Sequence, residues 1–329
     1  MNCITLKELP SPPPDKTGWP WTEVSDQLPH DMPDGIPWPK ISIVTPSLNQ
    51  GQFIEETIRS VLLQGYPNLE YIIIDGGSTD GSVSIIRKYE KWITYWVSEP
   101  DRGQSHALNK GFSKSTGDII NWLNADDFYL KGGLQAIGKI FQKCPGHMIV
   151  ASGIDFEEKT KNEVVVFPIR ISVENIIKFW EGWYDWLQPS IFFPKSAFLE
   201  VGALDETLHF AMDTDLYCRL MQSLPLLYID TPISKFRRHA WAKTSSQYND
   251  MMLEHIRVSF RYKKILGEPE AKNYDNQALL FLLRRTKHLL IKKRVRQFIK
   301  YLHYSLSISI LKFFLTLLTA FFHKVRMPI

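Results

Sequence analysis

Cysteine is scarce in this chain: only three occur among 329 residues, at Cys3, Cys144 and Cys218. An odd number of widely spaced cysteines fits neither a disulfide framework nor a zinc site, and it favours a reducing compartment. The first residues lack a basic segment followed by an apolar core, so we expect no secretory signal. An Asn-x-Ser/Thr sequon is absent as well. Together these absences argue against a secreted, disulfide-stabilised protein and predict a cytoplasmic one.

Glycine-rich phosphate loops are a second absence. An apolar strand is predicted at 41–45, and Pro46, Ser47, Leu48 and Asn49 follow it. A dinucleotide-binding fold requires Gly-x-Gly-x-x-Gly at that point, and the chain has no Walker loop either. A nucleotide bound by this chain would therefore be held through a metal and side chains rather than by a glycine cradle.

The excess of positive over negative charge is small, with a formal net charge of +4. We therefore expect no nucleic-acid partner. The positive charge is unevenly spread, and its local excess matters more than the total. One late segment is crowded with basic residues: Arg284, Arg285, Lys287, Lys292, Lys293, Arg294, Arg296 and Lys300.

Apolar periodicity alternates between strand and helix over the first hundred residues. Strands are predicted at 41–45, 69–74 and 93–97, and helices at 53–62 and 82–91. This alternation requires right-handed crossovers, and it predicts an α/β fold with a doubly wound, mostly parallel sheet flanked by helices.

Composition divides the chain into three parts. Residues 1–39 are rich in proline and tryptophan, so we expect an extended arm whose tryptophans either pack on the domain surface or bind a partner. Residues 40–246 form the predicted α/β domain, and 247–329 form a helical tail with one long helix expected at 279–302.

The end of the tail is apolar from Tyr304 to Phe322, which is nearly the thickness of a membrane. Polar residues recur there at steps of three and four, so we favour a helix that lies in the membrane interface. We expect a peripheral location on the inner face of the cell membrane, with the basic helix against anionic lipid. Packing on the chain's own domain or on a dimer partner is the alternative.

A short apolar run at 119–123 ends in polar residues, with Asn124 followed by Asp126 and Asp127. A buried parallel strand would deliver these side chains to the carboxyl edge of the sheet, where α/β folds bind ligands. Adjacent carboxylates favour a divalent metal, Mn²⁺ or Mg²⁺, that holds a diphosphate. The alternative is that both acids only cap the next helix.

Further candidates lie in later loops. Asp213 and Asp215 begin a predicted helix; one would serve as its N-cap, which leaves the other as a candidate general base. His239 and Lys243 stand in a basic loop that suits a diphosphate or its metal. Aromatic residues crowd the segment from Phe179 to Trp186, which is either core or a surface for sugar rings.

Four motifs in order carry a resemblance to a known family. They are Ile43–Ser47, Ile74–Gly81, Asn124–Asp127 and Met212–Asp213. With them the chain resembles the inverting family 2 glycosyltransferases of GT-A fold, over about Lys40 to Ser246. The resemblance implies transfer of a sugar from a nucleotide diphosphate sugar to an acceptor hydroxyl, with inversion and with a divalent cation.

The resemblance also implies site residues. Asp213 would be the catalytic base, Asp126 with Asp127 and His239 would bind the metal, and Asp75 would contact the nucleotide base. Lys243, Trp183 and Gln188 are candidates for contact with the diphosphate or the acceptor. The expected nucleotide-binding residues are Thr45, Pro46, Ser47, Asp75, Asp101, Gly103 and Asn124.

Three positions depart from the family pattern. Gly76 replaces the second acid of Asp-Asp-Gly, Asn124 replaces the first acid of Asp-x-Asp, and Met212 replaces the glutamate before the base. Asn124 removes one negative charge, so we expect weaker metal binding in the absence of nucleotide. Met212 leaves Asp213 to be tuned by burial or by Asp215.

The function expected from these residues is glycosyl transfer, in surface polysaccharide or glycolipid assembly, with a glycan or a lipid-linked acceptor. Two alternatives belong to other classes: a sugar nucleotidyltransferase, which normally has a glycine-rich basic loop after its first strand, and a non-catalytic protein that binds carbohydrate or membrane. Neither the donor base, the sugar nor the acceptor follows from the sequence.

Overall fold

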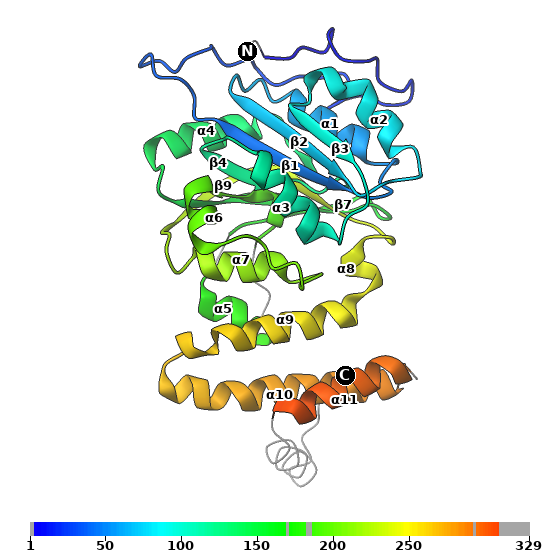
Figure 1. Cartoon of the computed structure of the whole chain (residues 1–329), viewed down its shortest axis with the longest axis vertical. Coiled ribbons are helices and arrows are strands. Elements are labelled where there is room, and N and C mark those ends of the chain that lie inside the picture. Colours follow the sequence, from blue (N-terminus) through cyan, green and yellow to red (C-terminus); the bar gives the residue numbers. More distant parts are fainter. Residues whose placement is uncertain (1–2, 169–170, 182–185, 292–293, 309–329) are drawn as a thin grey trace.

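A single sheet lies at the centre of the computed structural model, which describes residues 3–168, 171–181, 186–291 and 294–308 (Figure 1). The strand order in this part of the chain is β3-β2-β1-β4-β8-β6-β9-β5, and β7 pairs with β6. The predicted α/β class, with flanking helices and a helical tail, is confirmed. The strands are β1 (Ile41–Ser47), β2 (Leu69–Asp75), β3 (Tyr95–Ser98), β4 (Ile119–Trp122), β5 (Phe128–Tyr129), β6 (Met148–Glu157), β7 (Asn162–Val166), β8 (Ile191–Pro194) and β9 (Leu226–Arg238).

The first half of the sheet is parallel. Strand β1 pairs with β2 on one side and with β4 on the other, and β2 pairs with β3. The connections are the helices α1 (Ile54–Leu62), α2 (Ser82–Tyr89) and α3 (Gln104–Lys114). Strand β1 continues to Ser47, two residues beyond its expected end, because Pro46 keeps an extended backbone in register with Ile74.

The second half of the sheet is mixed. Strand β8 runs antiparallel to both β4 and β6, whereas β6 and β9 are parallel. Strand β9 is one strand of 13 residues, although polar residues interrupt its apolar pattern. It accommodates the polar Asp230-Thr231 interruption through register shifts against Ser152, the device by which an extra residue is absorbed in a sheet.

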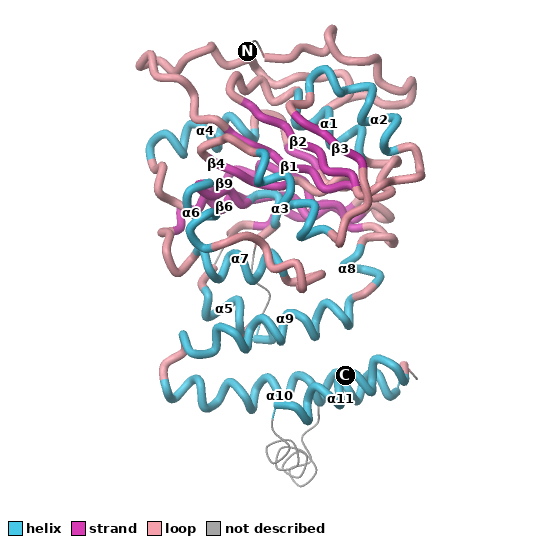
Figure 2. The backbone as a smooth tube through the Cα atoms, viewed as in Figure 1, coloured by secondary structure: helices cyan, strands magenta, loops and turns pink. Residues whose placement is uncertain are grey.

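Alternating side chains of the strands enter two apolar cores, one on each face of the sheet. Figure 2 shows helices on both sides of these strands. In β1, for example, Val44 belongs to one core and Ile43 to the other. The first core is covered by α3, α5 (Val173–Ile177), α6 (Lys195–Val201) and α7 (Met212–Leu220). The second is covered by α1, α2 and α4 (Gly133–Lys143). Because both faces are covered, the carboxyl edge of the strands remains for a ligand.

The proline-rich arm packs on the domain and is fixed by Arg59 of α1. The guanidinium of Arg59 is fully buried and donates to the carbonyls of Pro10, Pro20 and Trp21. Trp21 and Trp38 are buried as well, so these tryptophans pack on the domain as expected. The arm therefore covers the outside of α1 and reaches β5, where Trp19 donates to the carbonyl of Tyr129 at 2.8 Å.

The described part of the tail contains α9 (Tyr248–Tyr262), α10 (Glu268–Ile291) and α11 (Val295–Ile308). The expectation of one helix at 279–302 is wrong, because the chain turns near Arg294 and α11 packs back against α10 (Figure 1). A small core that includes Met252, Leu289 and Tyr301 joins the three helices. In the part of the chain that the structure describes, no helix has the length and apolarity to cross a membrane. The apolar stretch expected in the interface falls mostly at 309–322, outside the described residues.

Candidate active site

Strands β1 and β2 end side by side, with Ser47 and Asp75 in register. The buried carboxylate of Asp75 accepts four hydrogen bonds within the protein. The donors are the amides of Gly77 and Ser78 and the hydroxyls of Ser78 and Ser98, at 2.5–3.1 Å. Three of these donors bind Oδ2, whereas Oδ1 accepts only from the Ser78 hydroxyl, so Asp75 shapes the loop and its contact with a nucleotide base stays a prediction.

Asp101 lies beside the same loop and is free to accept. Its Oδ1 takes a hydrogen bond of 2.7 Å from the amide of Gly103, whereas no described residue donates to Oδ2. That second oxygen lies only 2.7 Å from where a Cβ at Gly76 would stand. Glycine at position 76 therefore makes room for the Asp101 carboxylate at the end of β2. The structure thus places a half-buried acid where the second Asp of the family motif is missing.

The loop after β1 is tied to the loop after β2. Asn49 has a positive φ of 53°, and its amide side chain accepts from Thr79 N at 2.9 Å. The amide of Gly51 donates to Asp80 at 2.7 Å. Next to this pair of loops, the hydroxyl of Ser47 is buried and has no partner among the described residues. Of the three residues expected at the strand end, Thr45 is engaged with Tyr71 inside the sheet, so Ser47 is the one whose polar atom is left to a ligand.

The end of β4 is held by a set of amides. Asn124 accepts from Gln104 at 2.8 Å and donates to both Asp127 and Gln188 at 3.2 Å. Gln188 in turn donates to the carbonyl of Trp122 at 2.8 Å. Gln188, predicted to contact the diphosphate or the acceptor, instead positions Asn124. Trp183, a candidate from the same set, lies outside the described residues.

Asp127 is 1% exposed, and both of its carboxylate oxygens accept hydrogen bonds, from the amide of Arg237 and from Asn124. Burial and the neighbouring Asp126 charge raise the pKa of Asp127 well above its ordinary value. The prediction of Asp127 as a metal ligand does not fit this geometry, because its oxygens point into the protein.

Asp126 points the other way, toward His239 at the end of β9. The distance from Asp126 Oδ2 to His239 Nε2 is 3.0 Å, and the His239 ring packs on Phe53 with ring centroids 4.7 Å apart. The second ring nitrogen of His239 is buried without a partner in the described part of the chain. The predicted pair of Asp126 and His239 is therefore brought together, from strands that are 113 residues apart in sequence.

Arg237 fixes this junction. Its side chain donates to the carbonyl of Asp126 at 2.9 Å and forms ion pairs of 2.7 Å with Glu56 and with Glu158. The guanidinium also lies over the rings of Phe53 and Phe128. Arg237 is buried, and its charge is compensated on every side. It therefore braces the ends of β4 and β9 rather than reaching a ligand.

A divalent metal fits Asp126 and His239 as a site completed by substrate. Among the described residues, no group of three or more His, Cys, Asp or Glu side chains is arranged to hold a metal by itself. Mg²⁺ and related ions at nucleotides usually take one or two protein ligands and draw the others from phosphates and water. The two side chains present are thus enough for an ion that arrives with a diphosphate.

Helix α7 begins at Met212, and the two acids of its first turn differ in their surroundings. Asp215 is bound by Arg219 and Arg261 at 3.0 Å, and by Tyr262 at 2.9 Å. Among the described residues, Asp213 accepts only from Thr214, through Oδ1. Burial raises the pKa of Asp213 to about 6. Asp213 is therefore the spare carboxylate of the pair, and it titrates near neutral pH.

The expectation that Asp213 or Asp215 caps α7 is wrong, because Glu254 of α9 serves that end of the helix. The Glu254 carboxylate accepts from the amides of His209, Phe210 and Ala211. These amides belong to the turn that leads into α7, whose N-cap position is Ala211. A residue of the tail thereby holds the segment that carries Asp213.

Lys243, at the start of α8 (Lys243–Ser246), lies close to Asp213. Its ammonium donates to the carbonyl of His209 and lies over the Phe210 ring, 5.0 Å from the centroid. Burial lowers the pKa of Lys243, and the negative charges of Glu254 and Asp213 oppose that effect. The structure thus places Lys243 near the candidate base, and its contact with the diphosphate or the acceptor stays a prediction.

Comparison with known proteins identifies the domain that carries this edge of the sheet. Residues 42–201 match the family model described as glycosyl transferase family 2. The chain carries a family 2 glycosyltransferase domain. An uncharacterized glycosyltransferase of Rickettsia typhi is 27% identical over 218 residues, which span 65% of this chain and 68% of the relative. One of Rickettsia felis is 26% identical over 270 residues, or 79% of this chain, but the match spans only 44% of that relative.

Solved structures support the same fold for the glycosyltransferase domain and its surroundings. S. aureus TarS 1–349 in complex with UDP-GlcNAc superposes with a TM-score of 0.61 at 17% identity, over 82% of this chain and 81% of that one. The mannosyltransferase PcManGT from Pyrobaculum calidifontis, in complex with GDP-Man and Mn²⁺, gives a TM-score of 0.53 at 15% identity, over 92% of each chain. The GT-A-like fold expected from the sequence motifs is confirmed.

Several residues of the glycosyltransferase site were missed by sequence reasoning. Gln104, Arg237 and Glu254 hold the three acid-bearing segments, yet none of them belongs to a family motif. In the sequence, Arg237 is one of several basic residues close to His239, and nothing there distinguishes it. A buried acid on an otherwise ordinary tail helix, such as Glu254, gives no signal in the sequence because its partners are backbone amides more than forty residues away.

We predict that Asp75→Ala lowers the free energy of unfolding by about 2–4 kcal/mol, because four hydrogen-bond donors lose their acceptor. Asp101→Ala, the matched control from the neighbouring loop, removes one hydrogen bond and is expected to lower it by less than about 1.5 kcal/mol. Urea denaturation of both variants measures the difference. Equal losses would contradict the division of roles between the two acids.

Proposed function

We propose that the chain transfers a sugar from a nucleotide diphosphate sugar to an acceptor hydroxyl, with inversion at the anomeric carbon. Three features carry the proposal: the Asp101 oxygen beside Gly76, the Asp126–His239 pair, and the Asp213 carboxylate, which accepts only from Thr214 among the described residues. These are an acceptor for a nucleotide base, a site for a metal-bound diphosphate, and a base for a hydroxyl. The Gln104–Asn124 hydrogen bond links the loop after Asp101 to the end of β4. Two structurally similar enzymes were solved with UDP-GlcNAc and with GDP-Man, which supports a donor of this class.

The nucleotide would lie over the ends of β1 and β2. Asp101 Oδ2 would accept from an N–H of the base in place of Asp75, whose oxygens are already engaged. The buried Ser47 hydroxyl, which lacks a partner, would bond the base or the ribose. Glycine at position 76 allows close approach, because it leaves no side chain between Asp101 and the ligand.

The diphosphate would lie between the ends of β4 and β9. Asp126 and His239 would hold a divalent cation there, and a bound cation would supply Lewis-acid stabilisation of the departing diphosphate. Lys243 would add a second positive charge from the other side of the site. Arg237 keeps Asp126 in place through its carbonyl, so that the carboxylate remains directed at His239.

Asp213 would take the proton of the acceptor hydroxyl as the oxygen attacks the anomeric carbon. One base is sufficient, because the leaving diphosphate needs no proton once its charge is compensated. With a pKa of about 6, Asp213 is mostly ionised at neutral pH. This pKa is also close enough to neutral pH for the carboxylate to accept a proton during the reaction. Attack from the side opposite the diphosphate inverts the configuration.

The setting of this reaction would be surface polysaccharide or glycolipid assembly, at the inner face of the cell membrane. The basic residues of the tail support attachment to anionic lipid, because Arg284 of α10, Arg294 in the turn after α10 and Arg296 of α11 are all exposed. The acceptor would then be a glycan or a lipid-linked glycan.

We predict that the chain releases free nucleoside diphosphate from a nucleotide sugar and that release requires Mn²⁺ or Mg²⁺. Screening uridine, guanosine and thymidine donors with and without metal tests the proposal. In Asp126→Ala the metal-dependent part of donor binding falls by about tenfold or more, because one of two protein ligands is lost. Release of pyrophosphate instead would favour a nucleotidyltransferase, and metal affinity unchanged by Asp126→Ala would contradict the metal assignment.

We predict that transfer declines as the pH falls through about 6, because protonation of Asp213 removes the base. Below that value kcat should fall about tenfold per pH unit. Asp213→Asn should lower transfer by about a hundredfold or more and leave donor binding intact. Asp230→Asn, on the exposed part of β9, is the matched control. A normal rate in Asp213→Asn, or an unchanged pH profile, would remove Asp213 from this role.

A further inference from the structure

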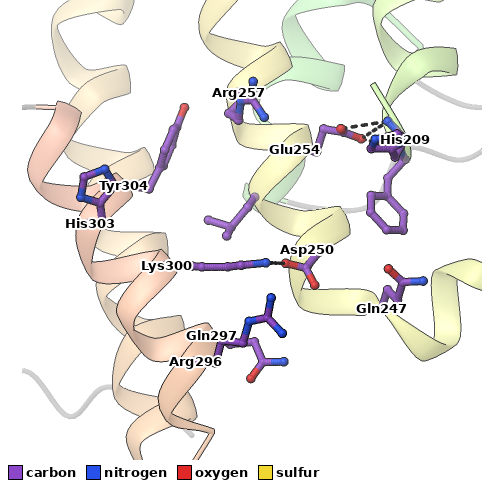
Figure 3. A pocket seen from close by; sticks show the side chains of 12 residues that line it. His209, Gln247, Asp250, Glu254, Arg257, Arg296, Gln297, Lys300, His303 and Tyr304 are labelled. Carbon is purple, nitrogen blue, oxygen red and sulfur yellow. Dashed lines mark hydrogen bonds and ion pairs between the residues drawn. The ribbon is translucent and has the colours of Figure 1, made fainter. Parts of the chain in front are cut away.

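A pocket of about 650 Å³ lies between the segment that leads to Asp213 and the helices of the tail (Figure 3). Its walls come from three places: His209 and Phe210 before α7, the outer face of α9, and one face of α11. A volume of this size is within the range of ligand pockets, roughly 300–1,000 Å³. The pocket lies outside the family motifs and next to the proposed base, three residues along the chain from Phe210.

The charged groups of the pocket divide into satisfied and unsatisfied ones. Lys300 of α11 is paired with Asp250 of α9 at 2.6 Å, which joins the two helices across the pocket (Figure 3). Glu254 is occupied by the three amides before α7. Arg257 of α9 and Arg296 of α11 line the same pocket, and both are exposed. Neither has an ion pair or hydrogen bond within the described residues, so the positive charge they bring is uncompensated.

Two unpaired guanidinium groups at one pocket favour a phosphate. Arginine presents planar N–H donors that match phosphate oxygens, and it is weakly hydrated compared with lysine. The His303 side chain of α11 also lines the pocket and adds a further donor. The acids that could oppose such a ligand are already bound, Asp250 by Lys300 and Glu254 by backbone amides.

Hydrogen bonds and a cation–π contact connect the walls of the pocket to the candidate active site. Glu254 fixes His209 and Phe210 to α9, and Lys243 contacts both of these residues from the side of Asp213. Arg257 and Arg296 lie on opposite sides of the Lys300–Asp250 pair (Figure 3), and a ligand bound at either arginine would lie beyond the wall that carries the base. This is the side from which an acceptor, rather than the nucleotide, would approach, since the nucleotide features lie at the ends of β1, β2 and β4.

We propose that this pocket, formed by His209, Phe210, α9 and α11, binds a phosphate group of the acceptor and so selects acceptors that carry phosphate. The inference rests on the proposed function, because it assigns the acceptor side of the same site. The tail helices then have a role in acceptor binding besides any contact with a membrane. The phosphate comes either from a lipid carrier or from a soluble sugar phosphate, since the two share the chemistry that the arginines recognise.

The test is calorimetric titration of the full chain with inorganic phosphate, in buffer with EDTA so that the metal-dependent diphosphate site is not formed. Arg257→Ala/Arg296→Ala should weaken phosphate binding by at least about tenfold, because two charge-assisted contacts are lost. The matched control is Arg87→Ala/Lys139→Ala, two exposed basic residues on α2 and α4 on the opposite face of the sheet, and it should bind as the unaltered chain does. Equal binding by the two double variants would overturn the proposal.

Two further probes identify the source of the phosphate: farnesyl diphosphate as a lipid-linked ligand and glucose 1-phosphate as a soluble one. Tighter, arginine-dependent binding of farnesyl diphosphate assigns the pocket to a lipid carrier, and arginine-dependent binding of glucose 1-phosphate at similar strength assigns it to a soluble acceptor. Absence of arginine-dependent binding for both probes would overturn the proposal. Phosphate binding is measured without donor, so its failure is distinct from failure of nucleoside diphosphate release, which tests the proposed function.

Discussion

The brace formed by Arg237 is the interaction on which the rest of the site depends. One buried guanidinium joins the end of β4, through the Asp126 carbonyl, to α1 through Glu56 and to the end of β6 through Glu158. Its own backbone amide holds the Asp127 carboxylate. Both halves of the sheet are thereby fixed at the edge where the acids emerge. Loss of one partner from such a buried network leaves uncompensated charge, which is why these groups occur together.

The fixed edge explains why adjacent acids have different roles. Asp127 and Asp75 are buried and accept hydrogen bonds from the protein through both oxygens, so they shape the backbone. Asp126 and Asp101 each keep an oxygen directed away from the sheet, toward His239 in one case and beside Gly76 in the other. In each pair, the acid that we propose for ligand binding is the one with an oxygen directed away from the sheet, and the other acid shapes the backbone next to it.

The sequence was sufficient to predict strands β1 to β4 with the helices between them, and to select Asp126 and His239 as one set, because strand ends and acid-rich tips are local signals. The role of Asp213 stays a prediction. The sequence does not tell the role of Asp75 from that of Asp101, since both stand near glycines. The hydrogen bonds from loop amides, which the sequence does not reveal, show which carboxylate is used within the protein. Arg237 and Glu254 were missed because their partners lie up to 181 residues away. The turn between α10 and α11 was also missed, because apolar spacing continues through it and tertiary packing decides where the helix ends.

The central claim is that one carboxylate, Asp213, activates the acceptor for a single displacement at the anomeric carbon. The most direct test is the anomeric configuration of the first transferred sugar, read from the proton coupling constant in NMR spectra of the product. A single displacement predicts the configuration opposite to that of the donor. Retention of the donor's configuration would contradict the account, because it requires a second displacement that this arrangement of acids does not provide.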